Sequence, residues 1–171
     1  DGSANLMPAW SPDKTKIVFA SNRGRDTAAG DESPFLDLWM VDLENNLSLS
    51  QIFASEGHDW TPAWSPNGSK IVFASTANSA DPDDVANLNI WLVDADGRNA
   101  RMLADNGLQD EDPVFSLDGE TIYYVAAMDQ CYSLWQVDVA PDSMATSLLD
   151  ADGRVICGED PSLSPDGRNL Y

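Results

Sequence analysis

The sequence of 171 residues carries little positive charge. It has 9 lysine and arginine residues against 29 aspartate and glutamate residues, a formal net charge of −20. Nucleic-acid binding depends on basic side chains that displace counterions from phosphates, so the composition argues against it. An anionic membrane surface is disfavoured for the same reason. The acidity is consistent with simple solubility, and it also permits a cationic partner, bound Ca²⁺ or a high-salt environment.

Long hydrophobic runs are also missing. No stretch of 18 or more apolar residues appears, so we expect no membrane-spanning segment. The numbering opens on Asp1, and we expect that processing or truncation has removed what preceded it. Hydrophobic residues nevertheless make up 43% of the chain. That content argues against general disorder and predicts one domain with a buried core.

Histidine is scarce, since His58 is the only one. A Ser-His-Asp triad needs a histidine beside an activated serine, and the sequence contains no Gly-x-Ser-x-Gly elbow. A histidine-rich metal site is equally excluded. We interpret His58 as a hydrogen-bonding loop residue and expect no enzyme activity in this chain. A catalytic domain outside the sequence stays open as an alternative.

A repeated motif is the most prominent feature that the sequence does contain. Pro-Ala-Trp-Ser-Pro occurs at Pro8–Pro12 and again at Pro62–Pro66, and looser copies begin at Pro113 and Pro161. The copies begin roughly 50 residues apart, which is typical of repeat architectures. Each copy leads into a polar tight turn, of which Asn67-Gly68 is an example.

Each full repeat divides into four short strands, and we find no helical periodicity. The second strand is apolar at every position, as expected of a strand covered on both faces. The third strand carries Trp39, Trp91 or Trp135, which we expect to fill the wedge between neighbouring sheets. The pattern predicts an all-β fold, a β-propeller of four-stranded antiparallel blades. We assign blades to about 6–54, 60–104 and 111–150, with the start of a fourth at about 159–171.

Antiparallel geometry predicts which end of the blades carries function. The connections between second and third strands, and between successive blades, share one end, while the tight turns share the other. Long variable connections tend to carry binding residues, so we predict a partner-binding face at their end. Its residues are Asp26, Asp31, Glu32, His58, Asp59, Trp60, Asp81, Asp83, Asp84, Asp110, Glu111, Asp112, Glu159 and Asp160.

Two features of this face leave alternatives open. Trp60 lies outside the repeated tryptophan positions, so it could stack on a ligand, anchor a partner or pack beneath its own loop. Clustered carboxylates could also hold Ca²⁺, which takes six to eight oxygen ligands. The candidate calcium ligands are Asp81, Asp83, Asp84, Asp110 and Asp112. They do not follow the EF-hand spacing, and a solvated acidic loop is the alternative. No other cofactor is expected.

The only two cysteines, Cys131 and Cys157, fall at the same end of the third repeat. A disulfide is therefore geometrically allowed, with two buried free thiols as the alternative. A bonded pair would favour an oxidising compartment. Asn46 and Asn67 begin formal glycosylation sequons on the tight-turn end, which matter only if the source glycosylates secreted proteins.

The repeat resembles that of the TolB-like propellers, Asp-x-x-Pro-x-Trp-Ser-Pro-Asp-Gly followed by an Ile-x-Phe-x-Ser strand and a strand with Leu-Trp-x-x-Asp. Pro8–Ser21, Asp59–Ser75 and Leu88–Asp94 match closely; Asp110–Val125 and Pro161–Gly167 match with substitutions. The resemblance implies a periplasmic or extracellular propeller, commonly of six blades, used for protein–protein contact. The repeat is also similar to propellers that cap serine peptidases of the prolyl-oligopeptidase type.

The sequence departs from this resemblance in holding only three full repeats and the start of a fourth. We expect either part of a longer propeller or a half-propeller completed by a second copy or another chain. The leading hypothesis is a non-enzymatic binding or scaffolding propeller with a protein partner. The alternatives are the substrate-gating propeller of a larger serine hydrolase and a structural subunit of an extracellular surface assembly.

Overall fold

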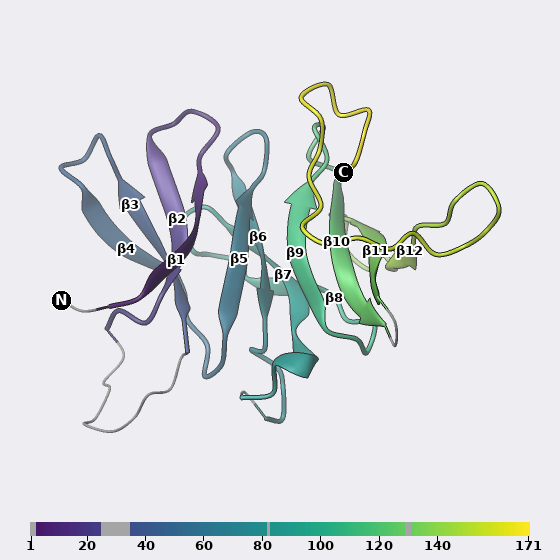
Figure 1. Ribbon diagram of the computed structural model, residues 1–171. Helices are drawn as coiled ribbons and strands as arrows, with labels where there is room; N and C mark the ends of the chain where they lie inside the picture. Colours follow the sequence, from purple (N-terminus) through teal and green to yellow (C-terminus); the bar gives the residue numbers. More distant parts are fainter. Residues whose placement is uncertain (1–2, 25–34, 82, 129–130) are drawn as a thin grey trace.

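The computed structural model describes residues 3–24, 35–81, 83–128 and 131–171. Three four-stranded antiparallel sheets stand side by side, each built from four consecutive strands (Figure 1). Sequence order runs from the purple strands near the N-terminus to the green strands of the third sheet. The predicted all-β propeller of four-stranded blades is confirmed. No helix among the described residues is long and apolar enough to cross a membrane.

The three sheets are the propeller blades. Blade 1 contains β1 (Asn5–Trp10), β2 (Lys16–Ser21), β3 (Asp37–Asp42) and β4 (Ser48–Phe53). Blade 2 contains β5 (Asp59–Trp64), β6 (Lys70–Ser75), β7 (Asn89–Asp94) and β8 (Arg101–Ala104), with the short 3₁₀ helix η1 (Val85–Asn87) before β7. Blade 3 contains β9 (Asp110–Phe115), β10 (Thr121–Met128), β11 (Cys131–Asp138) and β12 (Thr146–Ser147). Beyond them, Ser162 and Tyr171 exchange backbone hydrogen bonds and close a hairpin.

Apolar side chains between neighbouring blades form the core. Strand β6 shows why its segment is apolar throughout. Ile71 and Phe73 pack in the cluster that contains Val18 of blade 1, whereas Val72 packs in the cluster that contains Ile122 of blade 3. All three β6 side chains are 0% exposed. A strand between two blades buries both of its faces, so each full burial contributes about 1.5–3 kcal/mol.

The repeated tryptophans occupy three different environments. Trp91 is 8% exposed and lies in the core between blades 1 and 2, and Trp135 packs against the core between blades 2 and 3. Trp39 is half-buried and belongs to neither cluster of the described residues, so the prediction of an inter-blade core residue does not hold for it here. Trp39 pairs with Phe19, whose counterpart Phe73 in blade 2 faces blade 1. The corresponding face of blade 1 is therefore turned away from blade 2.

The serine of the repeated motif builds the tight turn that follows it. The Ser11 hydroxyl donates to Asp13 Oδ1 at 2.6 Å and accepts from the Lys16 N–H at 2.9 Å. Hydrogen bonds from Ser11 and Thr15 lower the pKa of Asp13 to about 2. The same serine-to-turn bond recurs in the pairs Ser65–Asn67, Ser116–Asp118 and Ser164–Asp166.

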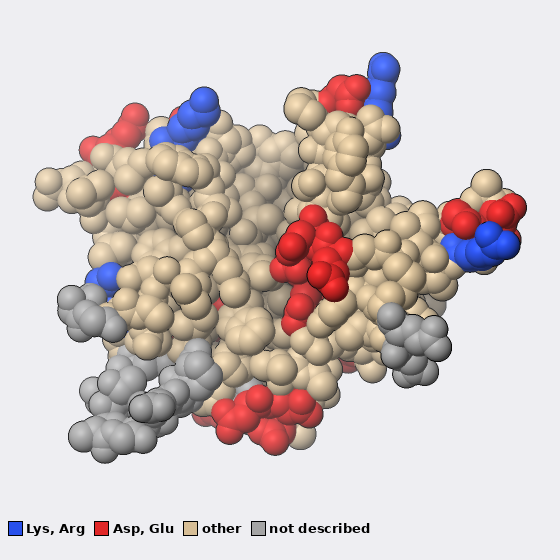
Figure 2. Space-filling view, in the orientation of Figure 1, with Lys and Arg blue, Asp and Glu red and all other residues tan. Residues whose placement is uncertain are grey.

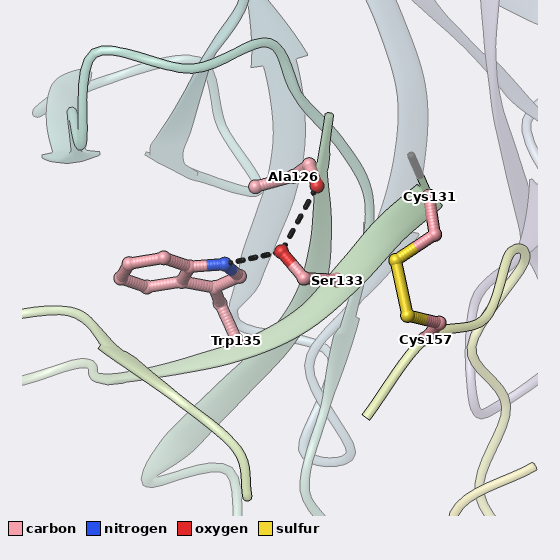
Figure 3. Close-up of a disulfide and its surroundings, with 5 residues drawn as sticks. All are labelled: Ala126, Cys131, Ser133, Trp135 and Cys157. Carbon is pink, nitrogen blue, oxygen red and sulfur yellow. Dashed lines mark hydrogen bonds between the residues drawn. A yellow bond between two sulfur atoms is a disulfide. The ribbon is translucent and has the colours of Figure 1, made fainter. Parts of the chain in front are cut away.

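The outer edge of blade 3 is split and joined by a disulfide. Strand β11 pairs with β12 along only part of its length. Nearer its start it pairs with a second segment, the one around Ile156, whose backbone oxygen accepts from the Leu134 N–H. The predicted disulfide between Cys131 and Cys157 ties this second segment to the start of β11 (Figure 3). A hairpin closed by the bridge between Leu149 and Val155 lies between β12 and this second segment, and it accounts for the extra length of the third repeat after its tryptophan.

Candidate functional site

The first strand of each full blade has a bulge at the residue before its proline. The register of β5 on β6 shifts between Trp60 and Ala63, and β1 and β9 shift at the matching place. The bulged residues Met7, Thr61 and Asp112 have φ of 52°, 45° and 51°, and Asp160, which also precedes a proline, has φ of 49°. A side chain in this left-handed region costs on the order of 1–2 kcal/mol, and a β-branched residue such as Thr61 is an outlier there. Sequence reasoning missed this feature, although the fixed proline was a signal that could have drawn attention to the residue before it.

These four residues and the prolines that follow them lie around one depression, which we call the axial hollow. Its volume is about 260 Å³. Its lining consists of Met7, Pro8, Thr61, Pro62, Ala63, Asp112, Pro113, Val114, Asp160 and Pro161. Proline rings and short apolar side chains form most of the wall, and the two carboxyl groups both come from the blade 3 and blade 4 side. The hollow can therefore accept an apolar group that carries a positive charge at one end.

A second depression, which we call the acidic cavity, adjoins the axial hollow. It has a volume of about 170 Å³ and is lined by Glu111, Asp112, Val125, Tyr132, Glu159 and Asp160. Asp112 and Asp160 line both depressions. Figure 2 shows acidic side chains gathered in front of blade 3, where the surface is hollowed. No lysine or arginine belongs to either lining, so among the described residues no cation of the chain lies with the four carboxyl groups in these depressions.

The carboxyl groups of the acidic cavity influence one another electrostatically. Burial, and then the carboxylates of Asp160 and Glu111, raise the pKa of Asp112 to about 6. The Glu111 carboxylate also raises the pKa of the Tyr132 phenol. Glu159 and Asp160 are exposed, and Glu111 and Asp112 are half-buried, so all four are accessible from solvent. A cation entering the cavity would relieve this repulsion.

A separate acidic stretch lies in the connection that contains η1. Asp81, Asp83 and Asp84 are exposed there. The Asp84 carboxylate accepts from the Ala86 N–H at 3.0 Å, and Asp81 accepts from the Asp83 N–H at 3.1 Å. These two carboxylates therefore stabilise the backbone of their own loop. The stretch still presents negative charge at the predicted partner-binding end.

Three residues of the predicted partner-binding face are buried, namely His58, Asp59 and Asp110, with exposures of 4%, 0% and 0%. The His58 ring contacts the rings of Phe35 and Trp60 at centroid distances of 5.0 and 4.8 Å. Asp59 accepts the Ser75 hydroxyl at 2.6 Å. Buried side chains cannot contact a partner in this conformation, so we leave these three out of the binding surface. They hold the connections between blades in place.

Trp60 is half-buried and packs edge-on against His58, which fits packing beneath its own loop. Asp26, Asp31 and Glu32, also predicted on the face, lie outside the described residues. The accessible part of the face is therefore carried by Asp81, Asp83, Asp84, Glu111, Asp112, Glu159 and Asp160.

The candidate calcium ligands do not form one group. Asp110 is buried at the start of β9, whereas Asp81, Asp83 and Asp84 are exposed near η1. Within the described ranges, no group of three or more histidine, cysteine, aspartate or glutamate side chains is placed to hold a metal ion. The arrangement gives calcium binding no support, and it stays a prediction.

Comparisons with known proteins agree with the propeller. No protein-family model matches the sequence. An uncharacterized protein of Agrobacterium fabrum is 32% identical over 126 residues, which cover 71% of this chain and 39% of that protein. The chain thus spans well under two thirds of the length of this relative.

Two solved structures share the fold at low sequence identity. TolB from Acinetobacter baumannii superimposes with a TM-score of 0.70 and 19% identity, over 96% of this chain and 36% of that one. A puromycin-hydrolyzing peptidase from Mycobacterium tuberculosis superimposes with a TM-score of 0.70 and 18% identity, over 99% of this chain and 28% of that one.

Proposed function

We propose that this chain, which has the fold of a TolB-like β-propeller, is a non-enzymatic binding propeller that holds a cationic segment of a protein partner. The observation that carries the proposal is the union of the axial hollow with the acidic cavity. Proline-rich walls accept apolar side chains, while four carboxyl groups at one side attract a lysine, an arginine or an N-terminal ammonium group. The charge arrangement favours both the approach and the orientation of such a segment.

The proposed setting is the periplasm or the outside of the cell. The disulfide between Cys131 and Cys157 supports an oxidising compartment, because such bonds persist there and are rare in the cytosol. The net charge of −20 supports a cationic partner over an acidic one.

Titration calorimetry with a synthetic peptide tests the proposal. The peptide combines apolar residues with lysine and arginine, and its control replaces every basic residue by glutamine. We expect wild-type protein to bind the cationic peptide only, and more weakly as the salt concentration rises, because exposed charges are screened.

Two variants with equal charge change locate the binding. The first neutralises the acidic cavity with Glu111→Gln, Asp112→Asn, Glu159→Gln and Asp160→Asn. The matched control neutralises four exposed acids of other connections with Glu44→Gln, Asp96→Asn, Glu120→Gln and Asp142→Asn. Loss of binding in the first variant alone supports the proposal. Equal loss in both, or no binding by wild-type protein, would overturn it.

A second candidate function is the substrate-gating propeller of a larger serine hydrolase. The similarity to the puromycin-hydrolyzing peptidase favours it, because that likeness covers 99% of this chain. The coding gene distinguishes the two functions. A continuation into a Gly-x-Ser-x-Gly segment would favour the hydrolase.

A further inference from the structure

A third depression lies between two connections of blade 2, and we call it the polar pocket. Its volume is about 280 Å³, and it is enclosed by the segments 78–81 and 86–89, between β6 and the start of β7, and by the connection 105–108. It shares no lining residue with the axial hollow or the acidic cavity. Alanine, glycine and leucine form part of its wall, and its polar lining consists of Asn78, Ser79, Asp81, Asn87, Asn89 and Asp105.

Asn89, the first residue of β7, brings a buried acceptor to this pocket. It is 9% exposed, and its side-chain Nδ2 donates to the Asn87 backbone oxygen at 3.1 Å. Because a carbonyl oxygen only accepts, this bond fixes which end of the amide faces Asn87 and leaves Oδ1 on the other side. Within the described part of the chain, no donor bonds to this Oδ1. A buried acceptor without a donor costs free energy, which a ligand that donates to it would recover.

The other two blades satisfy the equivalent position within the chain. The matching residues in the strand register are Asp37 in blade 1 and Ser133 in blade 3. Asp37 Oδ2 accepts from Gln51 Nε2 at 3.0 Å. The Ser133 hydroxyl accepts from the Trp135 indole N–H at 2.9 Å (Figure 3). Blade 2 therefore differs from its neighbours in turning an acceptor of this position toward a pocket.

Two carboxylates reach the pocket from different connections. Asp81 Oδ1 accepts from the Asp83 N–H at 3.1 Å, and Asp105 Oδ1 accepts from the Gly107 N–H at 3.0 Å. These bonds orient both carboxylates, and each keeps a second oxygen to which no donor of the described residues bonds. No lysine or arginine belongs to the described lining. The pocket thus presents several acceptors that a ligand can use.

The mixture of carboxylates and amides selects the kind of ligand. A hydroxyl group donates to one lining oxygen and also accepts from an amide N–H, which the exposed Asn78 side chain can supply. An anion would be repelled by Asp81 and Asp105. The carboxylates of the described residues do not gather into a metal-binding group. An uncharged ligand with several hydroxyl groups fits this lining, and its C–H groups can contact the alanine and leucine side chains.

We propose that the polar pocket binds a neutral monosaccharide. Sugar hydroxyls donate to Asn89 Oδ1 and to the open oxygens of Asp81 and Asp105, while the Asn78 amide donates to a hydroxyl oxygen. This site goes beyond the binding of a cationic segment, because it shares no residue with the axial hollow or the acidic cavity. Either site can fail its test without affecting the other.

NMR of nitrogen-15-labelled protein tests the proposal, with separate titrations of glucose, galactose, mannose and N-acetylglucosamine. We expect at least one of these sugars to shift the Asn89 side-chain amide and the Gly107 backbone amide saturably. The Gly68 amide, on a tight turn at the other end of the blade, should not move.

Two exposed aspartates provide a matched pair of variants. Asp105→Asn should weaken binding about tenfold, since hydrogen bonds to charged groups contribute more than those to neutral groups. Asp96→Asn is the control, because Asp96 Oδ1 also accepts from an N–H two residues further on, that of Arg98, but lies outside the pocket. Asn89→Ala should abolish binding, and the Asp105→Asn comparison decides the question even if Asn89→Ala fails to fold.

Three results would overturn the proposal. The first is the absence of a saturable shift at Asn89 and Gly107 with all four sugars. The second is equal weakening by Asp105→Asn and Asp96→Asn, which would place the sugar elsewhere. The third is a shift of the same resonances by arginine hydrochloride or calcium chloride but by none of the sugars, which would make the pocket a cation site.

Discussion

The indole Nε1 of Trp64 lies 3.1 Å from the backbone oxygen of Ala9 and donates a hydrogen bond to it. Trp64 and Ala9 belong to the two identical copies of Pro-Ala-Trp-Ser-Pro. The tryptophan of one repeat is thereby bonded to the backbone of the preceding repeat. Trp10, the counterpart of Trp64 in blade 1, is 58% exposed. The same sequence motif thus holds two blades together in one place and presents an aromatic surface in another.

Trp64→Phe should destabilise the protein by about 1 kcal/mol, because the Ala9 oxygen loses its donor at a packed junction. Chemical denaturation measures the change. Trp10→Phe is the matched control and should stay within about 0.5 kcal/mol of wild type, since its side chain is exposed. Equal effects of the two substitutions would contradict the inter-blade role of Trp64.

Ser75→Ala should destabilise the protein by about 1–3 kcal/mol. The change leaves the buried Asp59 carboxyl group without its closest donor and also removes the acceptor of the Ala77 N–H. Ser21→Ala removes the bond to the Asn5 side chain and should cost less, because Asn5 is exposed and its amide oxygen can accept from water instead. Urea unfolding of both variants gives the comparison, and a larger loss for Ser21→Ala would count against it.

Reduction of the disulfide should lower the free energy of unfolding by about 3–4 kcal/mol in the chain-entropy treatment of a closed loop. The bond links positions 26 residues apart. Unfolding midpoints with and without reductant measure the effect. A double Cys131→Ser, Cys157→Ser variant should have the unfolding midpoint of the reduced protein, and reductant should not change that midpoint. Two free thiols in native protein that was prepared without reductant would refute the bond.

The free energy of unfolding of the protein should fall as the pH rises through the titration of Asp112 in the acidic cavity. Its pKa is raised from 3.8 to about 6, so the neutral form contributes stability that is complete below about pH 4 and lost by about pH 6. Asp112→Asn should remove this part of the pH dependence and raise stability above pH 6 by roughly 1 kcal/mol, allowing for solvent screening. Melting temperatures across this range provide the measurement. A profile identical to wild type would contradict the raised pKa.

The sequence predicted the blade architecture because its signals are local and repeated. The all-apolar run at Ile71–Ala74 already implied a strand covered on both faces, and the structure buries it fully. The Asn67-Gly68 turn likewise appears where residues that tolerate positive φ occur, with Gly68 at φ 70°. The disulfide was predictable since strand order alone brings its two cysteines to one end.

The binding surface was less predictable because burial depends on three-dimensional packing. His58 and Asp59 look like loop residues in the sequence, yet the rings of Phe35 and Trp60 and the hydroxyl of Ser75 enclose them. The left-handed backbone at Asp112 depends on a bulge opposite β10, and the sequence indicates it only indirectly, through the proline that follows.

Fluorine NMR of protein labelled with 5-fluorotryptophan tests the stacking of the blades most directly. Single Trp→Phe substitutions assign the resonances of the six tryptophans, and the shift between H₂O and D₂O reports the exposure of each ring. Radial packing of blade on blade predicts almost no solvent shift for Trp91, which is 8% exposed, and a large one for Trp10, which is 58% exposed. A solvent shift at Trp91 as large as that at Trp10 would contradict the propeller arrangement.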